Sequence, residues 1–428
     1  MQSTSLEPFW NDQCLELSKF LWSQNLENLI FKNSQLNELF SIQTTNSPQL
    51  NQPNQSIQPI KTIIKTRKLR IYPNKKQCSK LKEWFDTTRY VYNKGVNEIK
   101  VNGNKSFIDL RNKLVTAKGN NLTEWELNVP KDVRAGALRD LDKARKTAFN
   151  NLKNGKIRKF DIKFRTKKFG YQSIEIPKTA VKSVDDFEST FNVFKTYGLG
   201  DIKICKRDSI PPIKFDLRLS HENNGRWFLL IPFESRIKSS QKNDRCSLDP
   251  GSRKFQTIYS PNEIRKITTN QVLLKKLKER ISNLAKLRSG KLISPNSYSL
   301  KINRLWTRHK DLVTDCHSKL SHYLAKNYEI IYIPKFESQK LTKKMNKTSN
   351  FNILNLQHFK FKERLRNKCI EYSSKMKECT EEYTSKTCTR CGQINEVGSS
   401  EIYKCSSCKL TIDRDVNGAR NIYLKCEI

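Results

Sequence analysis

The sequence is poor in acidic residues and contains no long hydrophobic run. Its 428 residues include 81 Lys and Arg but only 42 Asp and Glu, so the formal net charge at pH 7 is +39. No apolar stretch reaches the roughly 18 residues of a membrane-spanning helix, and no cleavable signal peptide is recognisable. These absences argue against a membrane protein and favour an intracellular one. The basic clusters are too widespread to single out a nuclear localisation signal, so the sequence leaves the nucleus undecided.

A positive charge of this size predicts a polyanionic partner, and nucleic acid is the default one. The charge is unevenly distributed: residues 1–60 hold two lysines and five acids, so the remaining 368 residues carry +42. Residues 41–60 are rich in Gln, Asn, Ser and Pro, which is typical of a disordered linker. We interpret residues 1–60 as a partly disordered N-terminal extension; the alternative is an arm that binds a partner through amphipathic helices.

Four of the twelve cysteines are regularly spaced. Cys388 and Cys391 form one Cys-x-x-Cys pair, and Cys405 and Cys408 form a second pair after thirteen intervening residues. Four thiolates presented in two such turns match the tetrahedral coordination of Zn²⁺. None of the five histidines lies near the pairs, so the site would be all-cysteine, closed and structural; a redox-active pair is the alternative.

The first half of the basic region has the pattern of a β domain with helices inserted into it. Residues 62–72 alternate in hydrophobicity, whereas 79–100 and 131–153 each carry an apolar stripe with helical period. Further alternating segments predict strands at 160–165, 213–219 and 227–233, the last after an Asn224-Gly225 hairpin turn. We therefore predict a small β-barrel or open sheet from residues 61–75 and 156–240, interrupted by a helical insert at 76–155.

The second half has the pattern of an α/β domain. An apolar strand leads to Asp249 and a Pro-Gly turn, and two helices follow, the clearer one over about 302–324. Ile330-Ile331-Tyr332-Ile333 is an uninterrupted apolar run of strand length. Such a run is typical of a central parallel strand that is buried on both faces. Strand, helices and strand in succession predict a right-handed crossover.

Three acids lie at or near the ends of predicted core elements in this half. Asp249 follows the first strand, Glu337 follows the buried strand, and Asp415 begins a predicted helix. An isolated Asp-Pro-Gly is more often only a turn. Three converging carboxylates would repel one another unless divalent cations neutralised them, and hard oxygen ligands select Mg²⁺ or Mn²⁺. Two such ions support phosphodiester hydrolysis, so the set predicts an RNase H-like nuclease.

Several motifs make the sequence recognisable. They are Arg67-Lys68-Leu69-Arg70-Ile71-Tyr72-Pro73, Thr88-Arg89-Tyr90-Val91-Tyr92-Asn93, Leu248-Asp249-Pro250-Gly251, Ile333-Pro334-Lys335-Phe336-Glu337, and the stretch from Tyr383 through the four cysteines to Ile422. In these motifs the chain resembles the TnpB nucleases of bacterial insertion sequences and, more closely, their eukaryotic and giant-virus relatives, the Fanzor proteins. The resemblance covers about residues 61–428.

The resemblance implies a multidomain α+β protein. An RNase H-like (RuvC-type) nuclease domain would comprise 244–385 and 411–428, with a zinc ribbon inserted at 386–410. The β domain at 61–75 and 156–240 would be a β-barrel wedge domain carrying a helical recognition insert at 76–155. The implied activity is that of a transposon-associated, Mg²⁺-dependent endonuclease that a guide RNA directs to double-stranded DNA, with no membrane partner and no small-molecule substrate.

The resemblance also assigns roles to individual residues. Asp249 and Asp415 correspond to the first and last catalytic acids of the family. Glu337 corresponds to the displaced middle acid of Fanzor-type sequences, because Pro334 stands where TnpB proteins usually carry Glu. The three acids would bind Mg²⁺, and the four cysteines would bind a structural zinc ion.

Three other functions remain compatible with these residues. The chain could be a transposase that joins DNA ends, a guide-RNA- and DNA-binding protein without cleavage if the change at Pro334 inactivates the site, or a nuclease without a guide.

Arg89 and Tyr92 are weaker candidates for nucleic-acid contact, because their position on or beside the apolar helix face favours core packing. Lys343 and Lys344 could equally steer phosphates or belong to a solvated loop. His317 and His322, five residues apart on a helix, are interpreted as packing or surface residues.

Overall fold

The computed structural model describes residues 62–116, 122–167, 172–185, 190–205, 209–222, 224–238, 244–251, 253–335, 353–380, 382–398 and 400–427. All of them lie in the unit Ile60–Ile428, which is separate in its internal contacts from Met1–Pro59. The expected N-terminal extension lies outside the described residues, as do the candidate residues Glu337, Lys343 and Lys344.

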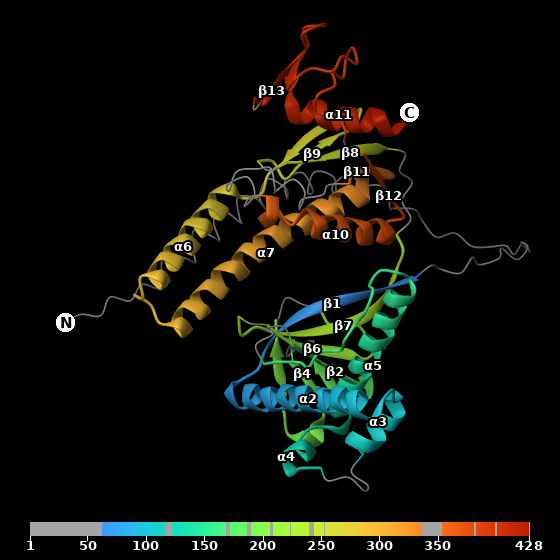
Figure 1. Ribbon diagram of the computed structural model, residues 1–428, viewed down its shortest axis with the longest axis vertical. Coiled ribbons are helices and arrows are strands. Elements are labelled where there is room, and N and C mark those ends of the chain that lie inside the picture. Colours follow the sequence, from blue (N-terminus) through green and yellow to red (C-terminus); the bar gives the residue numbers. More distant parts are fainter. Residues whose placement is uncertain are drawn as a thin grey trace, which may run out of the picture. The chain divides into compact units, whose positions relative to one another are not determined.

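The first half of the described chain is built on an antiparallel sheet of seven strands, in the order β2-β6-β7-β1-β5-β4-β3 (Figure 1). The strands are β1 Thr62–Tyr72, β2 Gln172–Ile176, β3 Val181–Asp185, β4 Thr190–Val193, β5 Ile202–Ile204, β6 Leu217–His221 and β7 Trp227–Arg236. β1 pairs with β7 from Thr62↔Arg236 to Ile71↔Trp227. The predicted hairpin is confirmed, since Gly225 turns between β6 and β7 with φ 80°.

This sheet curls into a near-closed barrel. β2 and β3 are the two edge strands, yet only the four residues from 177 to 180 connect them. So short a connection can join opposite edges only if the sheet curves round on itself. Side chains then alternate between the interior and the outside: Leu69, Ile71, Leu229 and Ile231 are almost fully buried.

Four helices accompany the barrel. They are α2 Lys75–Asn102, α3 Phe107–Leu114, α4 Glu124–Leu127 and α5 Lys131–Lys153. α2 begins four residues before the predicted start, because Asn74 and Gln77 form a capping box. Its first turns pack Leu81 and Trp84 against the barrel core, and its later turns pack Val91 and Val96 against α5.

The strand predicted at 160–165 is wrong. Residues 156–167 form no strand, and their apolar side chains pack on helices instead. The rings of Phe160 and Phe149 lie 4.9 Å apart, and Ile162 joins the cluster between α2 and α5. The alternation therefore reflects one side turned to a helix rather than pairing in a sheet. The strand predicted at 213–219 is confirmed only from Leu217 onward.

The second half is built on a mixed sheet of five strands, in the order β10-β9-β8-β11-β12. The strands are β8 Arg245–Pro250, β9 Gln256–Tyr259, β10 Ile264–Ile267, β11 Ile330–Pro334 and β12 Lys375–Cys379, and the helices are α6 Gln271–Ser289, α7 Pro295–Asn327, α10 His358–Glu371 and α11 Arg414–Glu427. β8, β9 and β10 form an antiparallel meander, whereas β11 is parallel to both β8 and β12. The predicted central parallel strand is confirmed.

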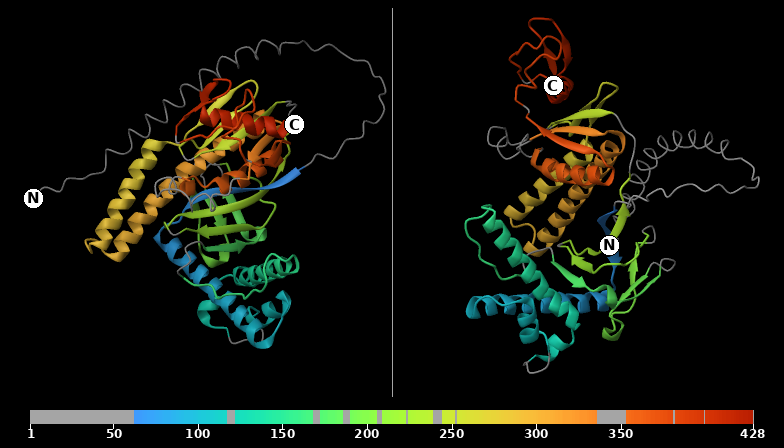
Figure 2. Two further views of the ribbon diagram at one scale, coloured as in Figure 1. Left: turned by 45° about the horizontal axis from the view of Figure 1, so that its top comes forward. Right: turned by 90° about the vertical axis from the view of Figure 1, so that its right-hand side faces the viewer.

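Both faces of this sheet are covered by helices. α11 lies on one face, and α7 with α10 lies on the other (Figures 1 and 2). Ile331 and Ile333 of β11 pack in the cluster with α7 and α10, whereas Ile330 and Tyr332 pack against Ile422 of α11. This explains why the sequence of β11 is apolar at every position.

None of the helices in the described ranges combines the length and the hydropathy that crossing a bilayer requires.

Candidate active site and cysteine cluster

Asp249 lies on β8 and faces α11. Cys246 and Leu248 of the same strand face the opposite side, because successive side chains of a strand alternate. Ser247 donates a hydrogen bond of 2.7 Å to the carbonyl oxygen of Ala419. A Cβ atom added at Gly418 would lie 2.7 Å from Asp249 Oδ2. The Asp249 carboxylate therefore packs directly against the backbone of α11 at Gly418, one turn after Asp415.

Asp415 occupies the first turn of α11, and Asp413 sets where that turn begins. Asp413 Oδ1 accepts hydrogen bonds from the backbone N–H groups of Asp415, at 3.1 Å, and Val416, at 3.2 Å. This is the pattern of a helix N-cap. The side chain of Asp415 is 41% exposed, so it stays accessible beside the buried helix backbone. The two predicted acids thus come from elements far apart in sequence to the same edge of the sheet.

Two lysines balance the charge of these acids. Lys254 Nζ lies 3.5 Å from both Asp413 Oδ2 and Asp415 Oδ2, and Lys266 Nζ lies 2.6 Å from Asp413 Oδ2. Burial alone would raise the pKa of Asp413, but the hydrogen bond from Lys266, the Val416 N–H and the charge of Lys254 together hold that pKa below its usual range. Asp413 is therefore ionised.

β11, the parallel neighbour of β8, ends beside Asp249. The pairing runs from Ile330↔Arg245 to Tyr332↔Ser247, and continuing that register by two residues aligns Pro334 with Asp249. The backbone N–H of Lys335 still bonds to the carbonyl oxygen of Cys379 on β12, at 3.0 Å. Glu337 follows shortly afterwards, outside the described residues.

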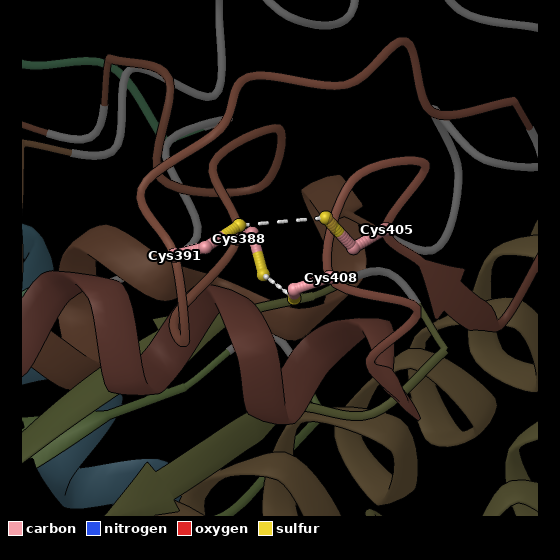
Figure 3. Close-up of side chains that lie close together, drawn as sticks. All are labelled: Cys388, Cys391, Cys405 and Cys408. Atoms are coloured by element: carbon pink, nitrogen blue, oxygen red, sulfur yellow. Dashed lines mark hydrogen bonds between the residues drawn. The ribbon is translucent and has the colours of Figure 1, made fainter.

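The four spaced cysteines converge on one point (Figure 3). All four sulfurs lie within 4.8 Å of one another; Cys388 Sγ and Cys408 Sγ are 3.5 Å apart, and Cys391 Sγ and Cys405 Sγ are 3.6 Å apart. Zn–S bonds of about 2.3 Å place the sulfurs of a tetrahedron about 3.8 Å apart. The cluster is consistent with a structural zinc ion.

Both cysteine loops use the same turn. The fourth residue after the first cysteine is left-handed in each, Gly392 with φ 76° and Lys409 with φ 59°. The turns are closed by hydrogen bonds from the N–H of Cys388 to Gln393 and from the N–H of Cys405 to Leu410, each 2.9 Å. Backbone N–H groups of Cys408 and Ser407 lower the pKa of the Cys405 thiol, whereas the pKa of the neighbouring Cys408 thiol is raised, so Cys405 is the first of the two to form a thiolate.

Two asparagines join the cysteine loops to α11, and sequence reasoning missed them. Asn421 Nδ2 donates to the carbonyl oxygens of Thr384 and Thr387, each at 2.7 Å, and Asn417 Nδ2 donates to Thr387 at 2.8 Å. The N–H of Thr389 returns a bond of 3.2 Å to Asn417 Oδ1. Both asparagines are buried. Two asparagines four residues apart on the apolar side of a predicted helix indicate buried hydrogen bonds, and this pattern could have identified them from the sequence.

The weaker candidates lie in the first half of the chain. Tyr92 is 5% exposed and packs between α2 and α5, with the guanidinium of Arg165 3.8 Å from its ring. Arg89 pairs with Asp86 at 2.8 Å and lines a cavity. Of the histidines, His317 is buried and stacks on Phe255, so it is a packing residue, whereas His322 lies beside the Tyr372 hydroxyl.

Two protein-family models match parts of the chain. A model described as "Cas12f1-like, TNB domain" matches residues 358–422, which contain α10, β12, the cysteine loops and most of α11. A model described as "Helix-turn-helix domain" matches residues 63–103, which form β1 and α2 here.

Full-length relatives are also found. The chain is 30% identical over 389 residues to a protein named "Putative transposase" from Paramecium bursaria Chlorella virus 1, covering 85% of this chain and 87% of that protein. It is 27% identical over 392 residues to a TnpB-like protein of Acanthamoeba polyphaga mimivirus, covering 84% and 73%. It is 22% identical over 382 residues to the "Putative RNA-guided DNA endonuclease InsQ" of Escherichia coli, covering 83% and 90%.

Among solved structures, the chain is similar to Cas12f1 in a complex with sgRNA and target DNA. The TM-score is 0.53 at 14% identity, and the match covers 84% of this chain and 98% of that one. At this identity the similarity concerns the fold.

Proposed function

The chain belongs to the TnpB-like family, and from that premise we propose that it is an RNA-guided, Mg²⁺-dependent DNA endonuclease. Its catalytic acids would be Asp249, Glu337 and Asp415. The observation that carries the proposal is the approach of Asp249 on β8 to the first turns of α11, where Asp415 lies and Gly418 leaves room for the carboxylate. The relative InsQ carries the name "Putative RNA-guided DNA endonuclease", which supports this proposal.

The five-stranded sheet supports a RuvC-type, RNase H-like catalytic domain. A meander of three antiparallel strands, extended beyond its first strand by two parallel strands, is typical of that fold, and acids at the carboxyl ends of β8 and β11 would share one edge. We propose the domain boundaries accordingly: nuclease 244–385 and 411–428, zinc ribbon 386–410, wedge barrel 61–75 and 156–240, recognition insert 76–155, and an N-terminal extension at 1–60.

The residues of this edge fit Mg²⁺. The donors are carboxylate oxygens, and the lysines beside Asp413 and Asp415 reflect how strongly the edge attracts cations. Bound Mg²⁺ would supply an activated water and stabilise the leaving oxygen of the phosphodiester, with two ions in the full mechanism. Asp413 fixes Asp415 by capping α11, and the cysteine loops, with zinc bound, would hold that helix through Asn417 and Asn421.

The distribution of charge supports guide RNA and double-stranded DNA as partners. Residues 271–308, which span α6 and the start of α7, hold ten lysines and arginines and one acid. α6 buries only Leu277 among its nineteen described residues. A polar, basic helix pair of this kind binds phosphates without reading sequence, and base pairing to a guide can then supply the specificity.

The test begins with purification of the full chain and sequencing of any RNA that stays bound. A DNA target that matches this RNA is then offered in Mg²⁺ to the wild type and to Asp249→Ala, Asp415→Ala and Glu337→Gln. We expect each substitution to reduce cleavage by about 10³-fold or more, because each removes a charge that organises the transition state. Glu234→Ala, in a half-exposed pair with Lys214 on the barrel, is the matched control and should cleave normally.

The same assay separates the other candidate functions. Equal cleavage by wild type and Asp249→Ala would overturn the catalytic assignment. Cleavage that persists after ribonuclease treatment would remove the guide from the proposal, and joined rather than cut products would indicate a transposase. Discrete bound RNA without any cleavage would indicate a guide-bound DNA-binding protein, the outcome that an inactivating change at Pro334 predicts.

A further inference from the structure

A cavity of about 400 Å³ lies between α2, α5 and the barrel strands β2 and β6. It is separate from the acidic edge of the five-stranded sheet. Its wall includes the side chains of Phe85, Arg89, Phe164, Arg165, Ser173 and Arg218. Its volume lies within the range of roughly 300–1,000 Å³ that small-molecule sites occupy. The cavity can therefore hold a ligand larger than an ion or a few water molecules.

The cavity lining is rich in arginine. It contains three arginines, against the single acid Asp140. Arg218 binds both carboxylate oxygens of Asp140, each at 2.9 Å, and Arg165 adds a third contact at 3.3 Å. Burial would raise the pKa of Asp140, but these contacts hold it below its usual range, so the acid is ionised and already paired. Two further acids lie just outside the lining: Asp86 pairs with Arg89, and Glu175 Oε2 is 3.8 Å from Arg218 Nη1. An anionic ligand would therefore be held by guanidinium N–H groups without an acceptor rather than by a large net charge.

Arg89 supplies the strongest evidence for a missing partner. One of its terminal nitrogens, Nη2, binds Asp86 at 2.8 Å. The other, Nη1, is buried and has no hydrogen-bond partner among the described residues. A buried guanidinium N–H without an acceptor is unfavourable, and an oxygen of a bound anion would relieve it.

The remaining wall is aromatic. Phe85 packs edge-on to Trp227 of the barrel with ring centroids 5.5 Å apart, which fixes its orientation. Phe164 is 46% exposed, and Lys100 Nζ lies 5.3 Å from its ring. A large exposed aromatic side chain beside fixed cations offers a flat apolar face next to a phosphate site. The ligand should therefore combine an aromatic ring with an anionic group.

We propose that this cavity binds one unstacked nucleotide, with its base against Phe85 and Phe164 and its phosphate on Arg89 and the neighbouring arginines. The inference rests on the proposed function in one respect, that the partner is a nucleic acid. A base within a duplex is stacked on both sides and cannot enter, so the nucleotide must come from an unpaired position. RNA and DNA share this chemistry and are distinguished by experiment.

The test uses the full chain, freed of bound nucleic acid by high salt, and photo-crosslinking. The probes are a single-stranded RNA with one 4-thiouridine and a single-stranded DNA with one 4-thiothymidine. We expect mass spectrometry to locate crosslinks on peptides that contain Phe85 or Phe164. Arg89→Gln and Phe164→Ser should each lower the yield at those peptides about tenfold, while Lys319→Gln, on the exposed part of α7 outside residues 271–308, should leave it unchanged. Because Phe164 is half exposed, its substitution spares the fold even where Arg89→Gln does not.

The outcomes separate the cavity from the nuclease. A higher yield with the RNA or with the DNA probe identifies the source of the nucleotide. Crosslinks confined to other basic surfaces, or an equal yield when the probe is fully base-paired, would overturn the proposal. Cavity crosslinks in a chain that cleaves no matched target would leave the cavity assigned and refute the proposed endonuclease.

Discussion

The two sheets are stabilised in different ways. The core of the seven-stranded sheet is formed by residues between Leu69 and Ile231, including the first turns of α2. The five-stranded sheet instead depends on the distant helix α11: Ile422 packs on Ile330 and Tyr332, and Glu427 binds Arg245 and the Tyr332 hydroxyl. The arginine-lined cavity therefore belongs to a region that is complete by Arg236. The acidic edge is complete only when the cysteine loops and α11 are in place.

The largest expected effect comes from removing zinc. Cys405→Ser takes away one of four thiolates, and structural zinc contributes about 10 kcal/mol or more to the folding of such sites. We expect zinc content to fall from about one equivalent to near zero, residues 384–413 to become sensitive to proteases, and cleavage activity to disappear.

The barrel should be unaffected by this change, and limited proteolysis measures both regions at once. Cys205→Ser, a half-buried cysteine outside the cluster, is the control. If both regions lost protection together, the two sheets would not be independent.

Mild acid should destabilise the five-stranded sheet more than the barrel, where burial lowers the pKa of His221 by less. His317 and His358 both stack on Phe255, and burial lowers the pKa of each to about 4 from 6.5. Between these values the unfolded chain binds protons that the folded chain does not, so stability falls as pH drops from 6.5 to 4. The loss is at most about 3 kcal/mol for each histidine, at 1.36 kcal/mol per pKa unit.

Hydrogen exchange at pH 7 and pH 5 measures this loss locally. Strands β8, β9 and β11 should exchange faster at pH 5 after correction for the intrinsic rate. His317→Asn should weaken the dependence on pH. A dependence of equal size in the variant would show that other groups cause it.

A smaller effect is expected at the joint between the cysteine loops and α11. Asn421→Ala removes the donors to the carbonyl oxygens of Thr384 and Thr387 and leaves both without this partner in a buried place. We expect a loss of about 2 kcal/mol, faster exchange at residues 384–389, and full retention of zinc.

The matched control is Asn327→Ala, because Asn327 makes a comparable bond to Tyr323 on an exposed helix surface. Loss of zinc from Asn421→Ala would show that the joint and the metal site are one unit. In that case the hydrogen bonds of Asn421 and the cysteine cluster would not stabilise the loops independently.

The smallest expected effect is a gain in zinc retention. Lys409 adopts the left-handed conformation that Gly392 adopts in the other loop. Lys409→Gly should relieve at most about 1 kcal/mol of strain, so that more chelator is needed to remove zinc. Gly392→Lys is the mirror-image control and should make zinc easier to remove. Opposite effects of the two substitutions would support the view that both loops use the same turn. Effects in the same direction would contradict it.

Much of the architecture could be predicted because burial leaves a periodic pattern. Continuous apolarity identified β11, and the stripe on residues 131–153 gave α5 its observed bounds. Alternation misled at Phe160 and Ile162, because one-sided packing on a helix gives the same pattern as a strand. The spacing of the cysteines was informative because zinc geometry restricts it.

The contacts that complete the sites could not be predicted, because they depend on register between distant elements. Nothing local at Lys254 or Lys266 indicates that they meet Asp413, about 150 residues later. The cavity is likewise invisible in sequence, since Arg89 and Arg218 come together only through the packing of α2 and β6. Asp140, the acid that pairs with Arg218, sits in a helix with many other charges.

The position of α11 in the chain also determines when the proposed enzyme can act during its synthesis. A ribosome translates the barrel, the cavity and the strands β8 to β12 before it reaches Asp415. The nascent chain can thus fold its arginine-lined region and meet nucleic acid while the acidic edge still lacks its last carboxylate. Arg245 and Tyr332 gain their contacts with Glu427 later still. Binding would precede cutting in time, and an interrupted translation product would be a DNA- or RNA-binding fragment without nuclease activity.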